Sequence, residues 1–195
     1  MEANCEMFVN HYNNLGFIYM NLDSIQQAEK AFESACRLEP DNELANYNLG
    51  VVSFELGNYS TAVHCLLTAI NLSKTPDLDQ YIYLVDSYNA KHQYDSSRYY
   101  INEVLEIVEG NKDQIDEYLL KRASIYAEYG DYENSISAID SVIARKPNID
   151  ITASAYFDRH LCYYMLGDSV KACEDYNYVM DLKPDCGATT LLNCR

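Results

Sequence analysis

One spacing of small and apolar residues recurs five times along this chain of 195 residues. In the first copy the anchor is Gly16, which is followed by Ala28 at +12 and Phe32 at +16. Small or apolar residues stand at the same offsets after each later anchor, and these anchors are Gly50, Val85, Ala123 and His160. Successive anchors are 34, 35, 38 and 37 residues apart. A period of this length indicates stacked supersecondary units, because one unit cannot bury its apolar face alone.

Each copy contains two apolar segments at helical spacing with a turn between them. The first segment places Leu15, Ile18 and Leu22 at intervals of three or four residues, which predicts an amphipathic helix. Turn-forming residues stand within the copies, as in "LGNYSTA", and between them, as in "LEPDNE". Pro40 is expected to end one helix and Asp41 or Asn42 to cap the next. No segment alternates like a strand, so an all-α chain of about ten antiparallel helices is predicted.

The first copy resembles a known repeat family. The pattern aromatic-x-x-Leu-Gly-x-x-Tyr, then Ala-x-x-x-Phe-x-x-Ala and a closing Pro, is similar to the tetratricopeptide repeat, or TPR. The residues that carry this pattern are Tyr12, Leu15, Gly16, Tyr19, Ala28, Phe32, Ala35 and Pro40. The resemblance implies a right-handed superhelical solenoid of five helix-turn-helix repeats. Their approximate limits are residues 9–42, 43–76, 78–111, 116–149 and 153–186.

The repeats are expected to form a single domain over residues 1–195. Residues 187–195 are interpreted as a truncated or short C-terminal cap, because solenoids of this family usually end in an extra polar helix. The anchors Val85 and His160 are larger than glycine. The helix pairs of the third and fifth repeats are therefore expected to spread locally.

Charge restricts the class of partner. The chain has 30 Asp and Glu against 14 Lys and Arg, which gives a formal net charge of −16. Nucleic acid and anionic membrane surfaces are disfavoured, because both are recognised by clustered basic residues. A protein or peptide with basic and apolar residues is the favoured partner. No stretch reads as a secretory signal or a membrane span, so direct membrane insertion is not expected.

Seven cysteines stand at positions 5, 36, 65, 162, 173, 186 and 194, without any C-x-x-C pair. An odd number in this arrangement fits free thiols in a reducing compartment better than a disulfide framework. A cytoplasmic location is therefore expected.

Neither a metal site nor a catalytic set is predicted. His160 and Cys162 point to different sides of a helix and do not readily share a metal, so His160 is expected to be a packed or capping histidine. The sequence has no G-x-S-x-G, P-loop, H-E-x-x-H or Gly-rich dinucleotide turn. We therefore expect a protein that is not an enzyme and that needs no cofactor.

The resemblance also implies where a partner would bind. In this family the first helices of the repeats line a concave groove, and residues flanking the Leu-Gly pair contact the partner. Those positions predict a groove that is apolar and amide-rich at its start, acidic in its middle and aromatic at its end. The predicted groove residues are Asn13, Asn14, Phe17, Tyr47, Asn48, Val51, Phe54, Glu55, Asp79, Asp86, Glu117, Glu128, Phe157 and Tyr164.

Two details of the groove concern the kind of peptide. Asn14 and Asn48 stand where the family places an asparagine that hydrogen-bonds an extended backbone, although a solvated polar face would look the same. Family members that bind the acidic tails of heat-shock chaperones are similar to one another in a carboxylate clamp of Lys, Asn and Arg. Only Asn48 matches among the corresponding residues, which are Asn13, Phe17, Asn48, Asp79 and Tyr83. A chaperone-tail adaptor is therefore disfavoured.

Three functions are left open by the sequence. The leading hypothesis is a non-enzymatic scaffold that binds an extended or helical segment of a partner protein in an acidic and aromatic groove. The alternative is a structural or self-associating module, with a homodimer formed through the C-terminal repeat, or the TPR part of a larger multidomain protein. The third is an enzyme, for which the abundance of ionisable residues is the sole support.

Overall fold

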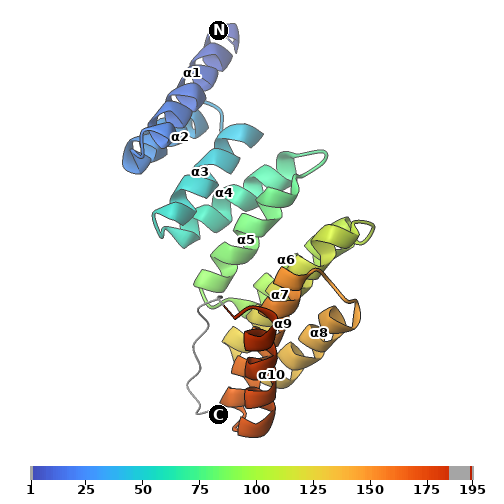
Figure 1. The fold of residues 1–195 in the computed structure, drawn as a ribbon. Helices are drawn as coiled ribbons and strands as arrows, with labels where there is room; N and C mark the ends of the chain where they lie inside the picture. Colours follow the sequence, from blue (N-terminus) through green and yellow to red (C-terminus); the bar gives the residue numbers. More distant parts are fainter. Residues whose placement is uncertain (1, 185–193, 195) are drawn as a thin grey trace. The chain divides into compact units, whose positions relative to one another are not determined.

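The computed structural model describes residues 2–184 and 194, and this part of the chain forms ten α-helices and no strand (Figure 1). None of the helices described is long and apolar enough to cross a membrane. The all-α helical repeat fold is confirmed. The helices are α1 (Glu2–Asn21), α2 (Ile25–Leu38), α3 (Glu43–Glu55), α4 (Tyr59–Leu72), α5 (Leu78–Ala90), α6 (Tyr94–Val108), α7 (Lys112–Tyr129), α8 (Tyr132–Ala144), α9 (Ile149–Met165) and α10 (Ser169–Leu182).

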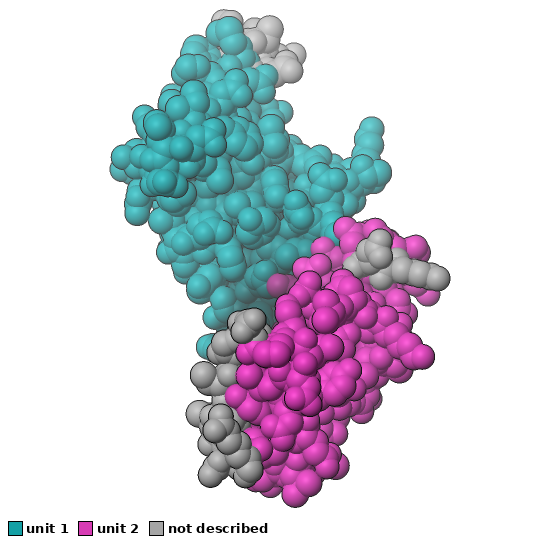
Figure 2. Space-filling model, in the orientation of Figure 1, with its two compact units in different colours: residues 1–100 teal, residues 101–195 magenta. Residues whose placement is uncertain are grey.

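The helices belong to two compact units (Figure 2). Unit 1 comprises residues 1–100 and unit 2 residues 101–195, so α6 contributes to both. In unit 1, α1 packs against α2 and α3 against α4, while in unit 2 α7 packs against α8 and α9 against α10. Neighbouring pairs stack through α2 on α3, α4 on α5 and α8 on α9. The repeats formed by α1 and α2, α3 and α4, α7 and α8, and α9 and α10 are therefore helix hairpins, as predicted. The segment expected to form a cap, residues 187–195, lies outside the described residues apart from Cys194.

The anchor of a repeat faces the +16 residue of the same repeat. A Cβ atom added to Gly16 would lie 2.4 Å from the ring of Phe32, and one added to Gly50 would lie 2.7 Å from Cγ of Leu66. These glycines are needed because the two helices of the hairpin cross closely, which requires small residues at the crossing point. In the fifth repeat the ring of His160 lies 5.6 Å from that of Tyr176, so a larger pair occupies the equivalent positions.

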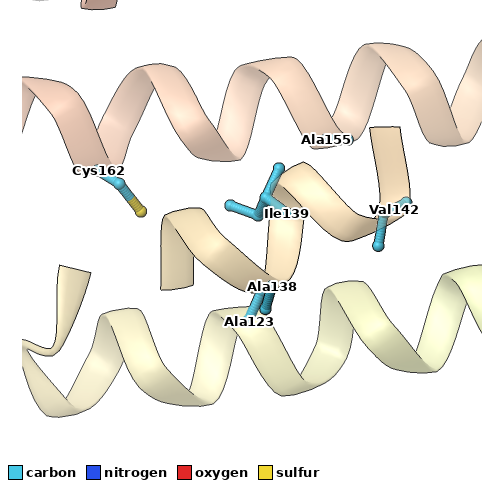
Figure 3. Packing of buried hydrophobic residues seen from close by; sticks show 6 residues of the cluster. All are labelled: Ala123, Ala138, Ile139, Val142, Ala155 and Cys162. Atoms are coloured by element: carbon cyan, nitrogen blue, oxygen red, sulfur yellow. The ribbon is translucent and has the colours of Figure 1, made fainter. Parts of the chain in front are cut away.

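Small side chains build the core of unit 2 around α8. Figure 3 shows Ala123 of α7 and Ala138 of α8 side by side, with Ile139 on the same helix. Ala155 and Cys162 close this cluster from α9. The buried alanines let all three helices approach one another, as the small positions of the repeat predict.

Side-chain hydrogen bonds join the two helices of the hairpin where the anchor is not glycine. Ser97 Oγ donates to the carbonyl oxygen of Val85 at 3.1 Å, and Ser135 Oγ donates to that of Ala123 at 2.8 Å. In the fifth repeat the direction is reversed, and His160 Nδ1 donates to the carbonyl oxygen of Ala172 at 2.8 Å. His160 is 1% exposed, so the expectation of a packed histidine is confirmed.

Turn geometry follows the same period. The residue at +7 from every anchor has a positive φ, and these residues are Asp23 (52°), Gly57 (77°), His92 (57°), Gly130 (86°) and Gly167 (78°). Glycine adopts this left-handed conformation without the steric cost that a side chain adds. Between the first two repeats α2 ends at Leu38, and Asn42 caps α3 by accepting a hydrogen bond from the Ala45 amide at 2.9 Å. Of the two predicted candidates, Asp41 and Asn42, it is therefore Asn42 that caps α3.

The expectation of unpaired cysteines is wrong for one pair. Cys173 on α10 forms a disulfide with Cys194, with a Cα–Cα distance of 5.0 Å. The two cysteines are 21 residues apart and belong to no sequence motif that indicates a disulfide. Three described cysteines are free, and burial raises the pKa of Cys36 to about 12 and that of Cys65 to about 11. Those two thiols stay protonated at neutral pH and are poor nucleophiles.

The anchor contact can be tested by adding one methyl group. We expect Gly16→Ala to lower the free energy of unfolding by roughly 1–2 kcal/mol, because displacing the Phe32 ring costs more than the helix gains from alanine. Urea unfolding followed by circular dichroism measures the change. Gly110→Ala is the control, since no atom lies within 4 Å of its added Cβ. Equal effects of the two substitutions would contradict the contact. Adding Phe32→Ile to Gly16→Ala should restore part of the lost stability, because the pair then matches Ala123 and Ile139 of the fourth repeat.

The disulfide can be tested by peptide mapping without a reducing agent, which should recover Cys173 and Cys194 in one cross-linked peptide. Cys194→Ser should lower the free energy of unfolding by about 3 kcal/mol, from the chain entropy that a loop of this length regains. Reductant should cause the same loss in the wild type and none in the variant. Recovery of both residues as free thiols from protein prepared without reductant would refute the bond.

Candidate protein-binding surfaces

First helices of neighbouring repeats touch each other directly. In unit 1, α1 touches α3 and α3 touches α5, and in unit 2, α7 touches α9. No contact of comparable extent joins α2 to α4 or α8 to α10 among the described residues. Each unit therefore has a first-helix face, formed by α1, α3 and α5 in unit 1 and by α7 and α9 in unit 2. The predicted groove residues all lie on these helices.

An aromatic cluster occupies the first-helix face of unit 1 between α3 and α5. The ring of Tyr83 lies 5.7 Å from that of Phe54 and 6.5 Å from that of Tyr47, and both contacts are edge-to-face. Phe54 also lies 5.6 Å from Tyr59 at the start of α4. Tyr47, Phe54 and Tyr83 are partly buried against the hydrophobic core that includes Leu66 and Leu84. One side of each ring is thus held by packing against the core, while part of each side chain stays accessible.

Carboxylates lie near the phenol groups of the aromatic cluster. Burial raises the pKa of Tyr83, and the negative charges of Glu55, Asp79 and Asp86 raise it further. Burial likewise raises the pKa of Tyr47, followed by the charge of Asp79. These electrostatic effects require the carboxylates to lie near the two phenol groups. Four predicted groove residues, Phe54, Glu55, Asp79 and Asp86, therefore lie near Tyr83, which was not predicted as a groove residue.

The amide-rich start of the predicted groove is only partly at the surface. Asn13 is 2% exposed and Asn48 is 4% exposed, whereas Asn14 is exposed. Both polar atoms of the Asn13 side chain and Nδ2 of Asn48 are buried without a hydrogen-bond partner among the described residues. Val51 is also buried, and Phe17 is 42% exposed with its ring edge-on to Phe32. The binding roles of these residues remain predictions.

A cavity opens on the first-helix face of unit 2. Its volume is about 190 Å³, and we call it the Asp158 socket. It lies between α7 and α9 over the start of α8, with Leu161 38% exposed and Met165 57% exposed at its edge. The lining residues are Ser124, Ala127, Glu128, Tyr132, Ser135, Asp158, Leu161, Cys162 and Met165.

Corresponding positions of the repeat build both surfaces. Residues at +4 and +5 from one anchor meet residues at −2 and +1 from the next anchor. In unit 1 these are Phe54 and Glu55 opposite Tyr83 and Asp86, whereas in unit 2 they are Ala127 and Glu128 opposite Asp158 and Leu161. Two large rings fill the space in unit 1. An alanine and an aspartate leave it open in unit 2.

Asp158 is a functional candidate that the sequence interpretation missed. It stands at −2 from its anchor, the position that Asn14 and Asn48 occupy in the first two repeats. Burial raises the pKa of its carboxyl group to about 6. No described residue donates a hydrogen bond to this carboxyl group or forms an ion pair with it. A desolvated and unpaired carboxyl group is a recognised mark of a functional position.

Cations close to Asp158 in the sequence or structure are engaged elsewhere. Arg159 binds Asp175 through two hydrogen bonds of 2.7 and 2.8 Å and Asp140 through one of 2.5 Å, which joins α8, α9 and α10. Lys183 lines a second cavity together with Asp158, but its ammonium group is paired with Asp150. Neither cation is therefore paired with the carboxyl group of Asp158 in the described part of the chain.

The other predicted groove residues of unit 2 do not all line one cavity. Glu128 is exposed and lines the Asp158 socket, while Glu117 is exposed on α7 but is not part of the lining. Phe157 is half-buried, packs 5.8 Å from His160 and lines the second cavity, whose volume is about 440 Å³. Tyr164 is half-buried on α9.

The Asp158 carboxyl group should reduce stability at neutral pH. Because its folded pKa lies above the ordinary 3.8, the folded chain binds the proton more tightly, and the free energy of unfolding falls as pH rises between about 4 and 6. We expect Asp158→Asn to raise the free energy of unfolding by about 2 kcal/mol above about pH 7 and to change it little near pH 4. Urea unfolding across this range measures both values. Asp181→Asn, at an exposed position of α10, is the matched control. A stabilisation that does not vary with pH would contradict the assignment.

Comparisons with known proteins agree with this architecture. The family profile described as tetratricopeptide repeat matches residues 11–42 and 44–76. No curated protein sequence gives a significant match. The TPR protein YrrB, described as having an unusual peptide-binding site, has a TM-score of 0.69 and 19% identity, with 90% of this chain and 86% of YrrB covered. MamA residues 41 to the end from Desulfovibrio magneticus RS-1 gives a TM-score of 0.75 and 15% identity, covering 92% and 97% of the two chains. A putative kinesin light chain from Podosopora anserina, with nearly identical TPR-like repeats, has a TM-score of 0.75 and 14% identity. The match covers 93% of this chain and 97% of that protein. The resemblance to the TPR family is confirmed. At these low identities, the similarity to the solved structures supports the fold alone.

Proposed function

We propose that this chain, whose residues 11–42 and 44–76 are tetratricopeptide repeats, is a non-enzymatic scaffold that binds a segment of a partner protein. The segment is extended or helical, carries basic and apolar side chains, and lies on the first-helix faces. TPR proteins serve typically as scaffolds for protein–protein interaction, and the similarity to YrrB, described as having a peptide-binding site, supports the same class here.

One observation carries the proposal: the charges of Glu55, Asp79 and Asp86 act on the phenol group of Tyr83, whose ring packs edge-to-face against Phe54. Aromatic faces attract cations through their quadrupole, and nearby carboxylates add direct charge attraction. Aromatic residues are also the usual anchors of binding energy in protein interfaces. An arginine or lysine of the segment, flanked by an apolar residue, therefore has complementary groups on this surface.

The remaining expectations about the partner are part of the same proposal. We expect no nucleic acid partner, because the net charge of −16 opposes phosphate binding. A homodimer through the C-terminal repeat is the alternative arrangement, and light scattering over a range of concentrations decides it. A cytoplasmic location is also still a prediction, and the Cys173–Cys194 disulfide is the feature that speaks against it.

Charge reversal on the first-helix face of unit 1 tests the function. The probe is a fluorescent peptide library of mixed lysine, arginine and leucine content, compared with a library in which glutamate replaces the basic residues. We expect the Glu55→Lys, Asp79→Lys double variant to weaken binding of the basic library at least tenfold, since it replaces attraction with repulsion. Fluorescence anisotropy at low and high salt measures the change.

The matched control is the Glu33→Lys, Asp41→Lys double variant, which makes the same change in net charge at exposed positions outside the first-helix face. It should keep most of the wild-type affinity. Equal losses in the two variants would show that only overall charge matters. Tighter binding of the acidic library to the wild type would refute the proposed partner class.

A further inference from the structure

The Asp158 socket combines apolar walls with one carboxyl group that lacks a partner in the described chain. Ala127, Leu161 and Met165 contribute the apolar part, and Leu161 and Met165 are 38% and 57% exposed. Glu128 adds a second carboxylate to the lining from α7. A ligand that fits must therefore be apolar along its length and positively charged at one end.

We propose that the Asp158 socket binds the side chain of a lysine in the partner segment, with its methylene groups against Leu161 and Met165 and its ammonium group at Asp158. This inference rests on the proposed function and names the residue that unit 2 recognises. Lysine has the required form, because its four methylene groups pack on apolar surface while the charged end reaches a polar group.

Lysine fits the polar groups of the socket better than arginine does. An ammonium group is a compact charge, whereas a guanidinium group carries five N–H donors in a rigid plane and needs several acceptors. Ser135 Oγ in the wall already donates to Ala123 and accepts from the Cys162 thiol at 3.3 Å. Ser124 Oγ donates to the carbonyl oxygen of Lys121 at 2.8 Å. Asp158 is an acceptor of the lining that has no hydrogen-bond or ion-pair partner among the described residues.

Comparison of the two first-helix faces supports a ligand role for Asp158. At the same repeat positions, unit 1 fills the space with the mutually packed rings of Phe54 and Tyr83. Unit 2 has a hollow there, with a carboxyl group that is partly withdrawn from water. A residue chosen for stability alone would fill the hollow or satisfy its own polar atoms, so the arrangement is explained by a group that enters from a partner.

The test uses short capped alanine peptides with one central residue, which is lysine, arginine, norleucine or glutamate. Binding to the whole chain is followed by NMR through the methyl group of Met165, in protein labelled at methionine methyls. We expect the lysine peptide to bind at least several-fold tighter than the arginine or norleucine peptides, and the glutamate peptide to cause no shift. Asp158→Asn should weaken the lysine peptide about tenfold and leave the norleucine peptide unchanged, because a charge-assisted hydrogen bond is lost without change of shape.

Asp181→Asn is the matched control, because it removes one exposed carboxylate from α10, outside the lining of the socket, and should leave the Met165 response to lysine unchanged. Equal affinity for lysine and norleucine, tighter binding of arginine, or an unchanged lysine affinity in Asp158→Asn would each overturn the socket. If Met165 does not respond while the basic library still binds and depends on Glu55 and Asp79, the socket fails and the proposed function stands. If neither probe binds the wild type, both fail.

Discussion

Crossing of the two helices within each hairpin is the contact on which the rest of the structure depends. Gly16 against Phe32 and Gly50 against Leu66 leave no room for even one added carbon atom. This contact fixes how far each first helix rotates about its own axis, and hence which residues reach its outer side. The positions at −2, +1, +4 and +5 from the anchor become surface positions for this reason, and both candidate surfaces are made from them.

A single architecture can therefore present different chemistry in its two units. The positions that hold Phe54 and Tyr83 in unit 1 hold Ala127 and Asp158 in unit 2, so a packed aromatic surface and a hollow arise without any change of backbone plan. Acidic residues occur on both surfaces, so each of them suits a basic group of a partner.

The fold could be predicted from the sequence because its determinants are local. Gly16 and Phe32, or Asn42 and Ala45, lie close in the sequence and belong to the same repeat or adjoining turn. The Asp158 socket could not be predicted in the same way, since its hollow depends on Ala127 in the preceding repeat and on which neighbouring cations are already paired. Burial of Asn13 and Asn48 likewise depends on how closely neighbouring first helices approach. The Cys173–Cys194 bond joins residues that share no sequence motif.

Local contacts also have a consequence for how the chain acquires its structure. Each hairpin closes over a separation of only 12 to 16 residues, as in the Ser135–Ala123 hydrogen bond and the His160–Tyr176 contact. Structures with such short-range contacts fold quickly, and a hairpin can form before the next one has been synthesised. The disulfide is different, because it requires Cys194, which the ribosome adds after the whole of α10. It can therefore attach Cys194 to a finished α10 but cannot guide the formation of the hairpin.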